Sequence, residues 1–513
     1  MAFNPGIYEM ESKPYAYETV ISEFPSPERR IARATPLAPY NPEHRTRTTC
    51  LIGLCLTYVL SLAAIFLPAV LLYGKATRTM QSTTTKEIVT LLLNICVTVC
   101  TECLGFIHSI SLRWALYNEG RLRYNSNLRL FTSAKHCAAN KWYTNCLWAL
   151  ALAFSYSSVS QAILPTGSDH TGSAAYIVSP QALSILGAAL LLQALLATWC
   201  IIPRKGRQIL SWNSSPLNTA LANLHRDADQ QLVVSRHPSA PKFRQQAAQK
   251  IIPALRKITV ALWAIVPLVT IWGAVTWYLA LKDTGSADTS FSPEDDTDGV
   301  YPESATAGGE ANSWLWRPDI DTIINIFIIT SMQLLYTLAL HAAEQVVNLS
   351  RDETQWRNAG TLTKGAQISL SSSKAALTSW QTLTLLALKP VSHWLFGLSA
   401  VTFSYGYLAF HPLPIFCLAA MSLFLATLVT VLGFRRPKGP QPATYGDLVK
   451  LAGYIDNWGT SASGKLFWGD KGVEQYDGNR VVRVAGTSPN MQYVSEIRMN
   501  GELYWNLGEE EDK

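Results

Sequence analysis

The sequence lacks the motifs that mark the common soluble enzymes. It contains no His-Glu-x-x-His zinc pair, no Gly-x-Ser-x-Gly nucleophile elbow and no glycine fingerprint for a dinucleotide. Charged residues are also scarce, because they make up 15% of the 513 residues whereas soluble domains average about 25%. We therefore expect no cofactor, and the composition argues against a typical soluble enzyme.

Cysteine is missing from the large polar loops. The chain has nine cysteines, but segments 165–181 and 282–322 contain none, which excludes a disulfide framework within these loops. Cys96, Cys100 and Cys103 share one face of a helix, where a soft metal could bind, but cysteine is also a common packing residue in apolar helices. We expect packing and no metal.

The first 45 residues lack the apolar run and the small-residue cleavage site of a signal peptide. They contain seven prolines and no amphipathic period, which is typical of a disordered tail. We predict that residues 1–45 form such a tail and that the first apolar stretch inserts the chain into a membrane.

Long apolar stretches are the main feature that the sequence does contain. Eight of them have about twenty residues, enough for a helix rising about 1.5 Å per residue to cross a hydrocarbon core of about 30 Å. We predict an all-α polytopic membrane helical bundle. Its eight spans are Cys50–Tyr73, Ile88–Ser111, Thr144–Leu164, Ala182–Pro203, Ile258–Leu281, Ile323–Val347, Ser392–His411 and Pro414–Phe434.

A ninth apolar stretch, Ala375–Leu388, is too short to span. Lys374 and Lys389 bracket it and Pro390 follows, so we predict an interfacial or re-entrant helix. A ninth span is the alternative.

Basic residues alternate along the chain. Counted from the N-terminus through the segments between the eight spans, Lys and Arg number six, three, six, none, ten, two, five, none and ten. Because basic loops stay on the cytoplasmic side, both termini are predicted to be cytoplasmic, in the plasma membrane or an endomembrane. The same residues favour contact with anionic lipids of the bilayer over binding of nucleic acid.

Two segments outside the spans have a distinct character. Residues 282–322 hold ten acidic residues and predict an acidic exterior loop. Residues 440–513 predict a small cytoplasmic α+β module. A capping box at Thr444 and Asp447 starts a helix there, and Asp477-Gly478 and Asn500-Gly501 each predict the turn of a hairpin.

One part of this module imitates a phosphate-binding loop. Gly459 is followed after four residues by Gly464-Lys465, but Leu466 occupies the position where a Ser or Thr would hold magnesium. A helix is predicted before this loop and a strand after it, the reverse of the required order. We therefore predict no nucleotide site.

Polar residues within the spans are the candidate intramembrane sites. Glu102 is the one carboxylate deep in a predicted span, with Asn94 and Thr98 on the same face. It could relay a proton or cation, or it could hold helices together by hydrogen bonds. His341 and Glu344 are three residues apart near a membrane face, but two ligands do not make a metal site.

Four polar stretches carry a family resemblance. They are Leu112–Leu116 with Glu119–Leu122 and Asn125–Leu130, then Ser211–Thr219, then Glu344 with Asn348–Glu353 and Trp356-Arg357, and finally Trp468–Lys471 with Ala485–Ser488. These stretches resemble a family of uncharacterised multi-pass membrane proteins of filamentous fungi, and the resemblance implies a membrane location but no activity.

The same stretches contain basic and aromatic residues suited to a membrane face. We expect contacts with lipid or a protein partner from Arg113, Trp114, Arg121, Arg129, Arg351, Trp356 and Arg357. Glu353 and Arg357 have the spacing of a helical ion pair. The favoured function is a scaffold, sensor or membrane-organising protein. The alternatives are a proton- or cation-coupled transporter or channel that uses Glu102 and, third, a lipid-modifying membrane enzyme.

Overall fold

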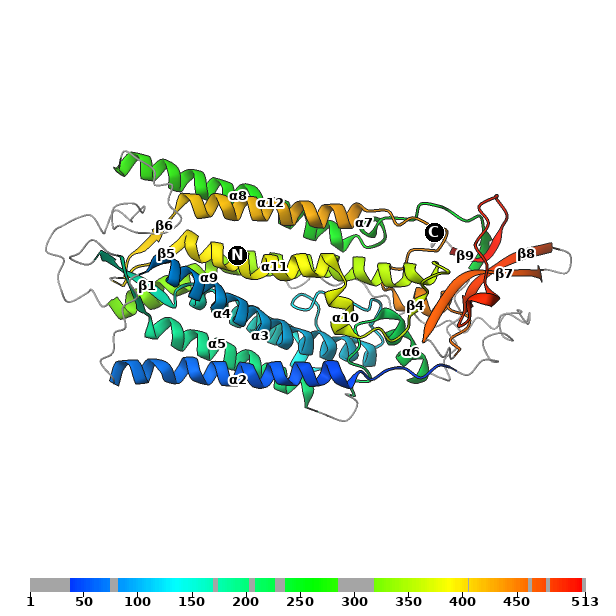
Figure 1. Ribbon diagram of the computed structural model, residues 1–513, viewed down its shortest axis with the longest axis horizontal. Coiled ribbons are helices and arrows are strands. Elements are labelled where there is room, and N and C mark those ends of the chain that lie inside the picture. Colours follow the sequence, from blue (N-terminus) through cyan, green and yellow to red (C-terminus); the bar gives the residue numbers. More distant parts are fainter. Residues whose placement is uncertain are drawn as a thin grey trace.

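The computed structural model describes residues 37–73, 82–168, 174–202, 208–226, 236–284, 318–404, 406–459, 464–476 and 480–509. Long helices lie side by side in an elongated bundle (Figure 1). Eight helices in these ranges have at least 19 residues. They are α2 (His44–Tyr73), α3 (Thr83–Asn118), α4 (Trp142–Ser160), α5 (Pro180–Ile201), α8 (Ala254–Thr284), α9 (Pro318–Ala359), α11 (Trp380–Ser399) and α12 (Pro412–Phe434).

Six of the described helices are long and apolar enough to cross a membrane, namely α2, α3, α5, α8, α9 and α12. Large apolar side chains point outward from them. Val59 and Val70 of α2 are each 66% exposed and Val260 of α8 is 68% exposed. Such a surface is unfavourable in water and favourable in a hydrocarbon core. These helices indicate a membrane-embedded protein.

Helices α4 and α11 are not among these six, yet they lie within the same bundle (Figure 1). Helix α4 packs on α5 and α9, and α11 packs on α3 and α12. Their polar side chains are buried, among them Ser157 of α4 and His393 of α11, both 0% exposed. Eight membrane spans therefore remain a prediction. The structure supports six of them by the length and composition of the helices.

The seventh predicted span has the wrong boundaries. Instead of a span from Ser392 to His411, α11 runs from Trp380 to Ser399, and the short strands β5 (Ala400–Thr402) and β6 (Leu408–Phe410) follow it. The prediction of a separate helix at Ala375–Leu388 is also wrong. Helix α10 (Ser372–Leu377) ends early, and the predicted residues from Trp380 onward belong to α11. The Ser379 hydroxyl caps the new helix by accepting from the Thr382 amide, and Pro390 lies inside it.

Two antiparallel hairpins lie at one end of the bundle, which we call the hairpin end (Figure 1). One pairs β1 (Ile163–Ser168) with β2 (Ala174–Val178), and the other pairs β5 with β6. The Ser404 amide donates to the Pro165 carbonyl at 3.0 Å and joins the two hairpins. The predicted acidic loop at 282–322 lies mostly outside the described residues.

The opposite end of the bundle carries a mixed region that we call the platform (Figure 1). It contains α6 (Pro216–Arg226), α13 (Leu448–Tyr454), the last turns of α9 and a five-stranded sheet. The strand order is β3 (Arg236–Ser239), β9 (Tyr504–Glu509), β8 (Arg480–Ser488), β7 (Lys465–Tyr476) and β4 (Ala366–Gln367). Short helices α7 (Ala248–Ile251), η2 (Ala138–Asn140) and η4 (Met491–Tyr493) complete the described elements.

Only one of the two predicted hairpins forms. Strands β7 and β8 pair antiparallel, from Phe467 opposite Ser488 to Tyr476 opposite Arg480, and the predicted turn residues Asp477-Gly478 lie outside the described residues. Gly501 has the expected positive φ of 88°, but the segment before it forms no strand, and β9 instead pairs parallel with β8 and antiparallel with β3. A parallel partner cannot be joined by a tight turn, so turn chemistry alone could not predict it.

The start of α13 also differs from the prediction. Asp447 is its N-cap, and one carboxylate oxygen accepts from the Val449 and Lys450 amides, each at 3.2 Å. Thr444 therefore lies outside the helix and does not cap it. The strand predicted after the imitation phosphate loop is confirmed, because β7 begins at Lys465.

The platform is assembled from distant parts of the chain, so residues 440–513 do not form a separate module. Strands β3 and β4 come from the segments after α5 and α9. The core that packs beneath the sheet includes Ala38, Leu217 and Trp356 as well as C-terminal residues. The Ala38 amide donates to the Trp458 carbonyl at 3.0 Å. The predicted disordered tail, 1–45, is therefore too long, since residues 37–43 pack on the platform.

We expect a fragment of residues 440–513 to remain unfolded. Two of the five strands and much of the core lie elsewhere in the chain, and a region that cannot bury its apolar surface does not fold alone. Circular dichroism of the purified fragment should show no cooperative thermal transition. A sharp transition would show that the C-terminal segment is an independent domain.

Candidate functional site

A lysine at the centre of the bundle forms two ion pairs with carboxylates. Lys389 of α11 is only 2% exposed. Its Nζ donates to Glu102 Oε1 of α3 and, at 3.1 Å, to Glu344 Oε2 of α9. The two carboxylates are each about one-third exposed. Three helices thus meet at one ammonium group.

The pair His341 and Glu344 extends this cluster, as their spacing on α9 allows. His341 Nδ1 lies 3.3 Å from Glu344 Oε2, and Arg129 Nη2 lies 3.0 Å from the same ring nitrogen. Arg129 comes from the segment after α3, and its guanidinium lies against Gly105, where a Cβ would clash with it. We call Glu102, Arg129, His341, Glu344 and Lys389 the charge cluster.

The charge cluster is electrically balanced. Its two carboxylates face two permanent cations, the Lys389 ammonium and the Arg129 guanidinium, so the net formal charge is zero with a neutral imidazole. Desolvating unpaired charges in a bundle core costs several kcal/mol per ion. Balance therefore lets these groups be buried, and any change in protonation disturbs it.

Three members of the cluster have the geometry of a loose metal-binding set. One ligand atom each from Glu102, His341 and Glu344 lie within 4.8 Å of one another. Oxygen and imidazole ligands suit several divalent ions. However, the Lys389 ammonium already bonds both carboxylates and Arg129 approaches the imidazole, so a divalent ion would meet two fixed positive charges.

The predicted polar face of α3 points into the bundle. Asn94 is 0% and Thr98 1% exposed. The Thr98 hydroxyl donates to the Asn94 carbonyl at 2.7 Å, and the Asn94 side-chain amide donates to the Thr90 carbonyl at 3.0 Å. The structure therefore places Asn94, Thr98 and Glu102 on one interior face, as their spacing of four residues predicts.

Aromatic and amide groups surround the charge cluster on its other side. His393 lies one turn after Lys389 on α11, and its ring stacks on Tyr156 of α4 with centroids 3.5 Å apart. Gln333 Nε2 of α9 lies 3.0 Å from His393 Nδ1. All three side chains are fully buried. They fix α11 against α4 and α9 at the level of the cluster.

A small cavity opens beside the charge cluster on the side of the platform. It has a volume of about 20 Å³, which is room for about one water molecule. Its lining is Ser109, Ser126, Asn127, Leu128, Arg129, Leu130, Phe131, His341, Glu344, Gln345 and Asn348. Three members of the charge cluster, Arg129, His341 and Glu344, thus line this cavity.

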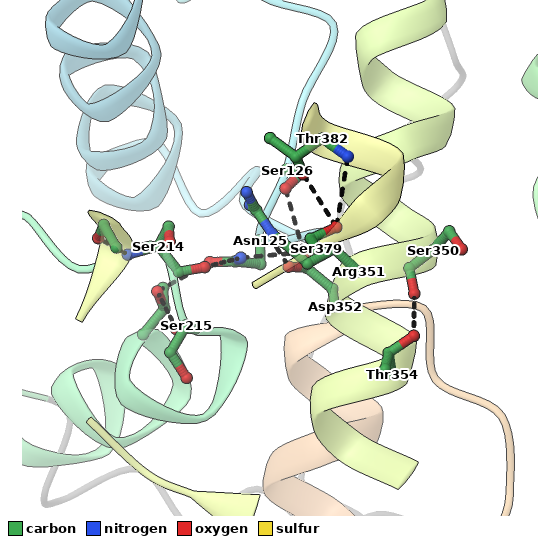
Figure 2. Close-up of polar contacts among 12 residues, drawn as sticks. Asn125, Ser126, Ser214, Ser215, Ser350, Arg351, Asp352, Thr354, Ser379 and Thr382 are labelled. Carbon is green, nitrogen blue, oxygen red and sulfur yellow. Dashed lines mark hydrogen bonds and ion pairs between the residues drawn. The ribbon is translucent and has the colours of Figure 1, made fainter. Parts of the chain in front are cut away.

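A second polar network joins the bundle to the platform, centred on Asp352 of α9. Figure 2 shows Asn125, Ser126, Ser214 and Asp352 drawn together. Asp352 Oδ2 accepts from Asn125 Nδ2 and Ser126 Oγ, each at 3.0 Å, and Asn125 Nδ2 also donates to the Ser214 carbonyl at 2.9 Å. Three of the four polar stretches noted in the sequence thus meet at this network.

Several residues expected at the membrane face lie inside the platform instead. Arg113 is 4% exposed, and its guanidinium donates to the Asn125 and Asn213 carbonyls at 3.0 and 2.7 Å. Trp114 is 2% exposed and donates to the Ser211 carbonyl. The expectation of lipid contact is corrected for these residues and for the buried Trp356, because their polar atoms bond protein.

The remaining basic candidates are partly buried and mostly paired. Arg121 bonds Glu119 at 3.0 Å, and Arg129 belongs to the charge cluster. Arg351 lies 3.9 Å from Asp352. The predicted helical pair of Glu353 with Arg357 is confirmed at 2.7 Å.

Glu353 also holds the segment that leads into α13. Its Oε2 accepts from the Thr444 and Tyr445 amides at 2.9 and 2.8 Å. Tyr445 has a positive φ of 48°, a conformation that needs such support. Burial raises the pKa of the Tyr445 phenol well above its usual range, and the Glu353 carboxylate adds to this shift.

Lys389 is the functional candidate that sequence reasoning missed. In the sequence, a lysine next to a proline predicts the end of a short interfacial helix. Two signals indicate otherwise, namely the 20-residue length of Trp380–Ser399 and the position of His393 four residues after Lys389. Together they predict one polar face on a membrane-length helix.

Comparison of the chain with family models, with curated proteins and with solved structures found no match.

Proposed function

We propose that the protein is a proton- or cation-coupled membrane transporter and that the charge cluster is its coupling site. The observation that carries this proposal is the Lys389 ammonium, 2% exposed and bonded to Glu102 and Glu344 from two other helices. Ionisable groups inside a membrane are costly, and they commonly mark ion pathways and proton relays.

The coupling follows from the charge balance of the cluster. Protonation of either carboxylate removes one partner of Lys389 and leaves a net positive charge between α3, α9 and α11. A binding event that changes the relative energies of two helix arrangements shifts the population between them. The ion pairs join three helices, so their loss would allow α11 to move against α3 and α9.

The proposed orientation places the platform in the cytoplasm and the hairpin end outside. It rests on the alternation of basic residues along the chain. In this orientation the small cavity beside Glu344 opens to the cytoplasm, and basic residues near the platform face anionic lipids of the inner leaflet. Membership of the fungal family and the choice between plasma membrane and endomembrane are likewise proposals.

The platform favours a second candidate function, that of a scaffold or sensor. Helix α9 runs without interruption from the hairpin end through the charge cluster to the buried Trp356. A rigid helix of this kind can transmit a change at the cluster to a protein partner on the platform. A closed bundle without ion flux would support this function. The described residues add no support for a lipid-modifying enzyme.

The test uses the full chain purified and reconstituted in liposomes. The triple variant Glu102→Gln, Glu344→Gln, Lys389→Met removes the charges of the three-residue salt bridge while keeping side chains of similar size. We expect ion-driven or pH-driven flux to fall by about 100-fold or more, the effect typical of removing a proton-transferring group.

Glu502→Gln is the matched control, because Glu502 pairs with Arg483 on the platform and outside the bundle. Its flux should equal that of the wild type. Absence of flux in the wild type across protons, Na⁺, K⁺ and divalent cations would overturn the transporter proposal and favour the scaffold.

A further inference from the structure

The bundle consists of two halves in which the same elements follow in the same order. The first half contains α2, α3, α4, the β1–β2 hairpin and α5, and the second contains α8, α9, α11, the β5–β6 hairpin and α12. In each half the first helix packs on the fourth, and these two pairs lie at opposite edges of the bundle (Figure 1). A platform helix follows each half, α6 after the first and α13 after the second. This order indicates an internal duplication.

The positions at which corresponding helices begin support the duplication. The fourth helices α5 and α12 begin at Pro180 and Pro412, and the platform helices α6 and α13 begin at Pro216 and Leu448. Both pairs are separated by the same number of positions along the chain. The third helices α4 and α11 each begin at a tryptophan, and the first helices α2 and α8 each contain one proline.

One hydrogen-bonded contact recurs at corresponding positions of the two halves. Thr198 of α5 and Thr430 of α12 have the same separation along the chain as the starts of their helices. Each hydroxyl donates to the carbonyl four residues earlier on its own helix. Thr198 Oγ1 also lies 2.8 Å from the Tyr58 hydroxyl of α2, and Thr430 Oγ1 accepts from Trp263 Nε1 of α8 at 2.9 Å. The two outer helix pairs are therefore built alike.

The second helices also correspond where they enter the platform. The sequence Asn-x-Gly-x-Leu at 118–122, where α3 ends, recurs at 358–362, where α9 ends. Arg113 and Glu353 precede these motifs by the same number of positions. Arg113 donates to a backbone carbonyl ahead of α6, and Glu353 accepts from two backbone amides ahead of α13. Each second helix thus holds the chain that leads into the platform helix of its own half.

The charge cluster lies between the two halves. Glu102 and Arg129 belong to the first half, and His341, Glu344 and Lys389 belong to the second. The contacts of Lys389 with Glu102 and of Arg129 with His341 therefore cross from one half to the other. Each half has four long helices, so both halves start and finish at the platform end and have the same direction. In transporters built from such repeats, the ion site commonly lies between the repeats, and one repeat rocks against the other.

Toward the hairpin end, the two halves close against each other through hydrogen bonds between neutral groups. The Gln161 side-chain amide is 0% exposed. It donates to the Ala400 carbonyl at 2.9 Å and accepts from the Thr402 amide at 2.8 Å. Ser157 Oγ of α4 lies 2.5 Å from Thr330 Oγ1 of α9. Neutral hydrogen bonds contribute little net free energy because water can replace them, so these contacts can open and re-form.

The same region is closely packed. A Cβ on Gly397 of α11 would clash with Ser160 of α4. The cavity beside the charge cluster lies on the other side, toward the platform. The structure is therefore closed between the halves toward the hairpin end. We call these contacts the seam, which comprises Ser157, Ser160 and Gln161 of the first half and Thr330, Gly397, Ala400 and Thr402 of the second.

We propose, on the basis of the transport function above, that the transport path runs between the two halves and that the seam is its gate at the hairpin end. The halves separate along the seam to give access to the charge cluster, and they close again to the arrangement seen in the structure. The helices within each half keep their contacts during this motion, because the rocking of one repeat against another is largely a rigid-body movement.

A disulfide across the seam tests the proposal. In the double variant Ser157→Cys, Thr330→Cys, two sulfurs replace oxygens that lie 2.5 Å apart, and a disulfide needs about 2.0 Å between its sulfurs. The full chain is reconstituted in liposomes, oxidised with copper phenanthroline and assayed for flux of protons, Na⁺, K⁺ and divalent cations. We expect flux to fall to the level of protein-free liposomes after oxidation and to return after reduction with dithiothreitol.

Ile163→Cys, Val178→Cys is the matched control, because these residues lie opposite each other in the β1–β2 hairpin of one half. Ser157→Cys alone controls for the native cysteines. Both controls should keep wild-type flux after oxidation. Undiminished flux in the double variant, with the seam disulfide verified by mass spectrometry, would overturn the gate and leave the transport function standing. No flux of any ion in the wild type would overturn both.

Discussion

Lys389→Met should lower the free energy of unfolding of the bundle by about 3–5 kcal/mol, the cost of leaving a buried ion pair without one partner. The methionine fills a similar volume, so the loss arises from charge and not from a cavity. The Glu102 and Glu344 carboxylates would repel each other with no ammonium between them. Unfolding of the purified protein in mixed micelles, followed by tryptophan fluorescence, measures the change.

The triple variant with neutral residues at 102, 344 and 389 should recover most of this loss. Replacing all members of a buried ion pair by uncharged groups of similar size is often neutral for stability. Lys374→Met on α10 is the surface control, because Lys374 is exposed. Equal stability of Lys389→Met and wild type would show that the ion pairs contribute nothing to the fold.

These variants distinguish a transporter from a scaffold. They also distinguish the contribution of Lys389 to stability from its contribution to ion flux. A scaffold needs the bundle intact, so the triple variant should serve as well as the wild type. A transporter needs the titrating groups, so the same folded variant should be inactive. Stability and flux must therefore be measured on one preparation of each protein.

The interior face of α3 could be predicted from the sequence because it depends only on helical spacing. Asn94, Thr98 and Glu102 repeat every four residues, and an α-helix brings such residues onto one face whatever surrounds it. The partner of Glu102 could not be predicted in this way. Lys389 lies 287 positions away along the chain, and no local rule specifies which helices pack together.

The platform likewise contains features that depend on local sequence and features that depend on contacts between distant parts of the chain. The β7–β8 hairpin depends on local turn chemistry, and the prediction of its strands is confirmed. Strands β3 and β4 have four and two residues and come from segments far from the C-terminus. Such short strands carry almost no pattern of their own, so their pairing is decided by the assembled sheet. The buried positions of Arg113 and Trp114 have the same origin, because basic and aromatic residues suit a lipid surface and a hydrogen-bonded interior equally well.

Trp356→Ala should destabilise the platform by about 3–5 kcal/mol, the usual cost of removing a buried aromatic side chain. Trp356 is 0% exposed, and its Nε1 donates to the Pro442 carbonyl at 2.8 Å. Its ring centre lies 6.4 Å from those of Tyr454 and Trp468, so α9, α13 and β7 all lose contact. Limited proteolysis of the full chain in detergent should cleave the C-terminal segment much faster than in the wild type.

The bundle should survive this change, because the charge cluster lies three to four turns away from Trp356 on α9, about 18–22 Å at about 1.5 Å per residue. Trp142→Ala on α4 is the matched control, since Trp142 is 69% exposed and its loss should leave the cleavage rate unaltered. If Trp356→Ala also abolished ion flux in liposomes while the helices stayed folded, the platform would have to be coupled to the charge cluster through α9. Flux at the wild-type level with a cleaved platform would instead show that the bundle works alone and that the platform serves a partner.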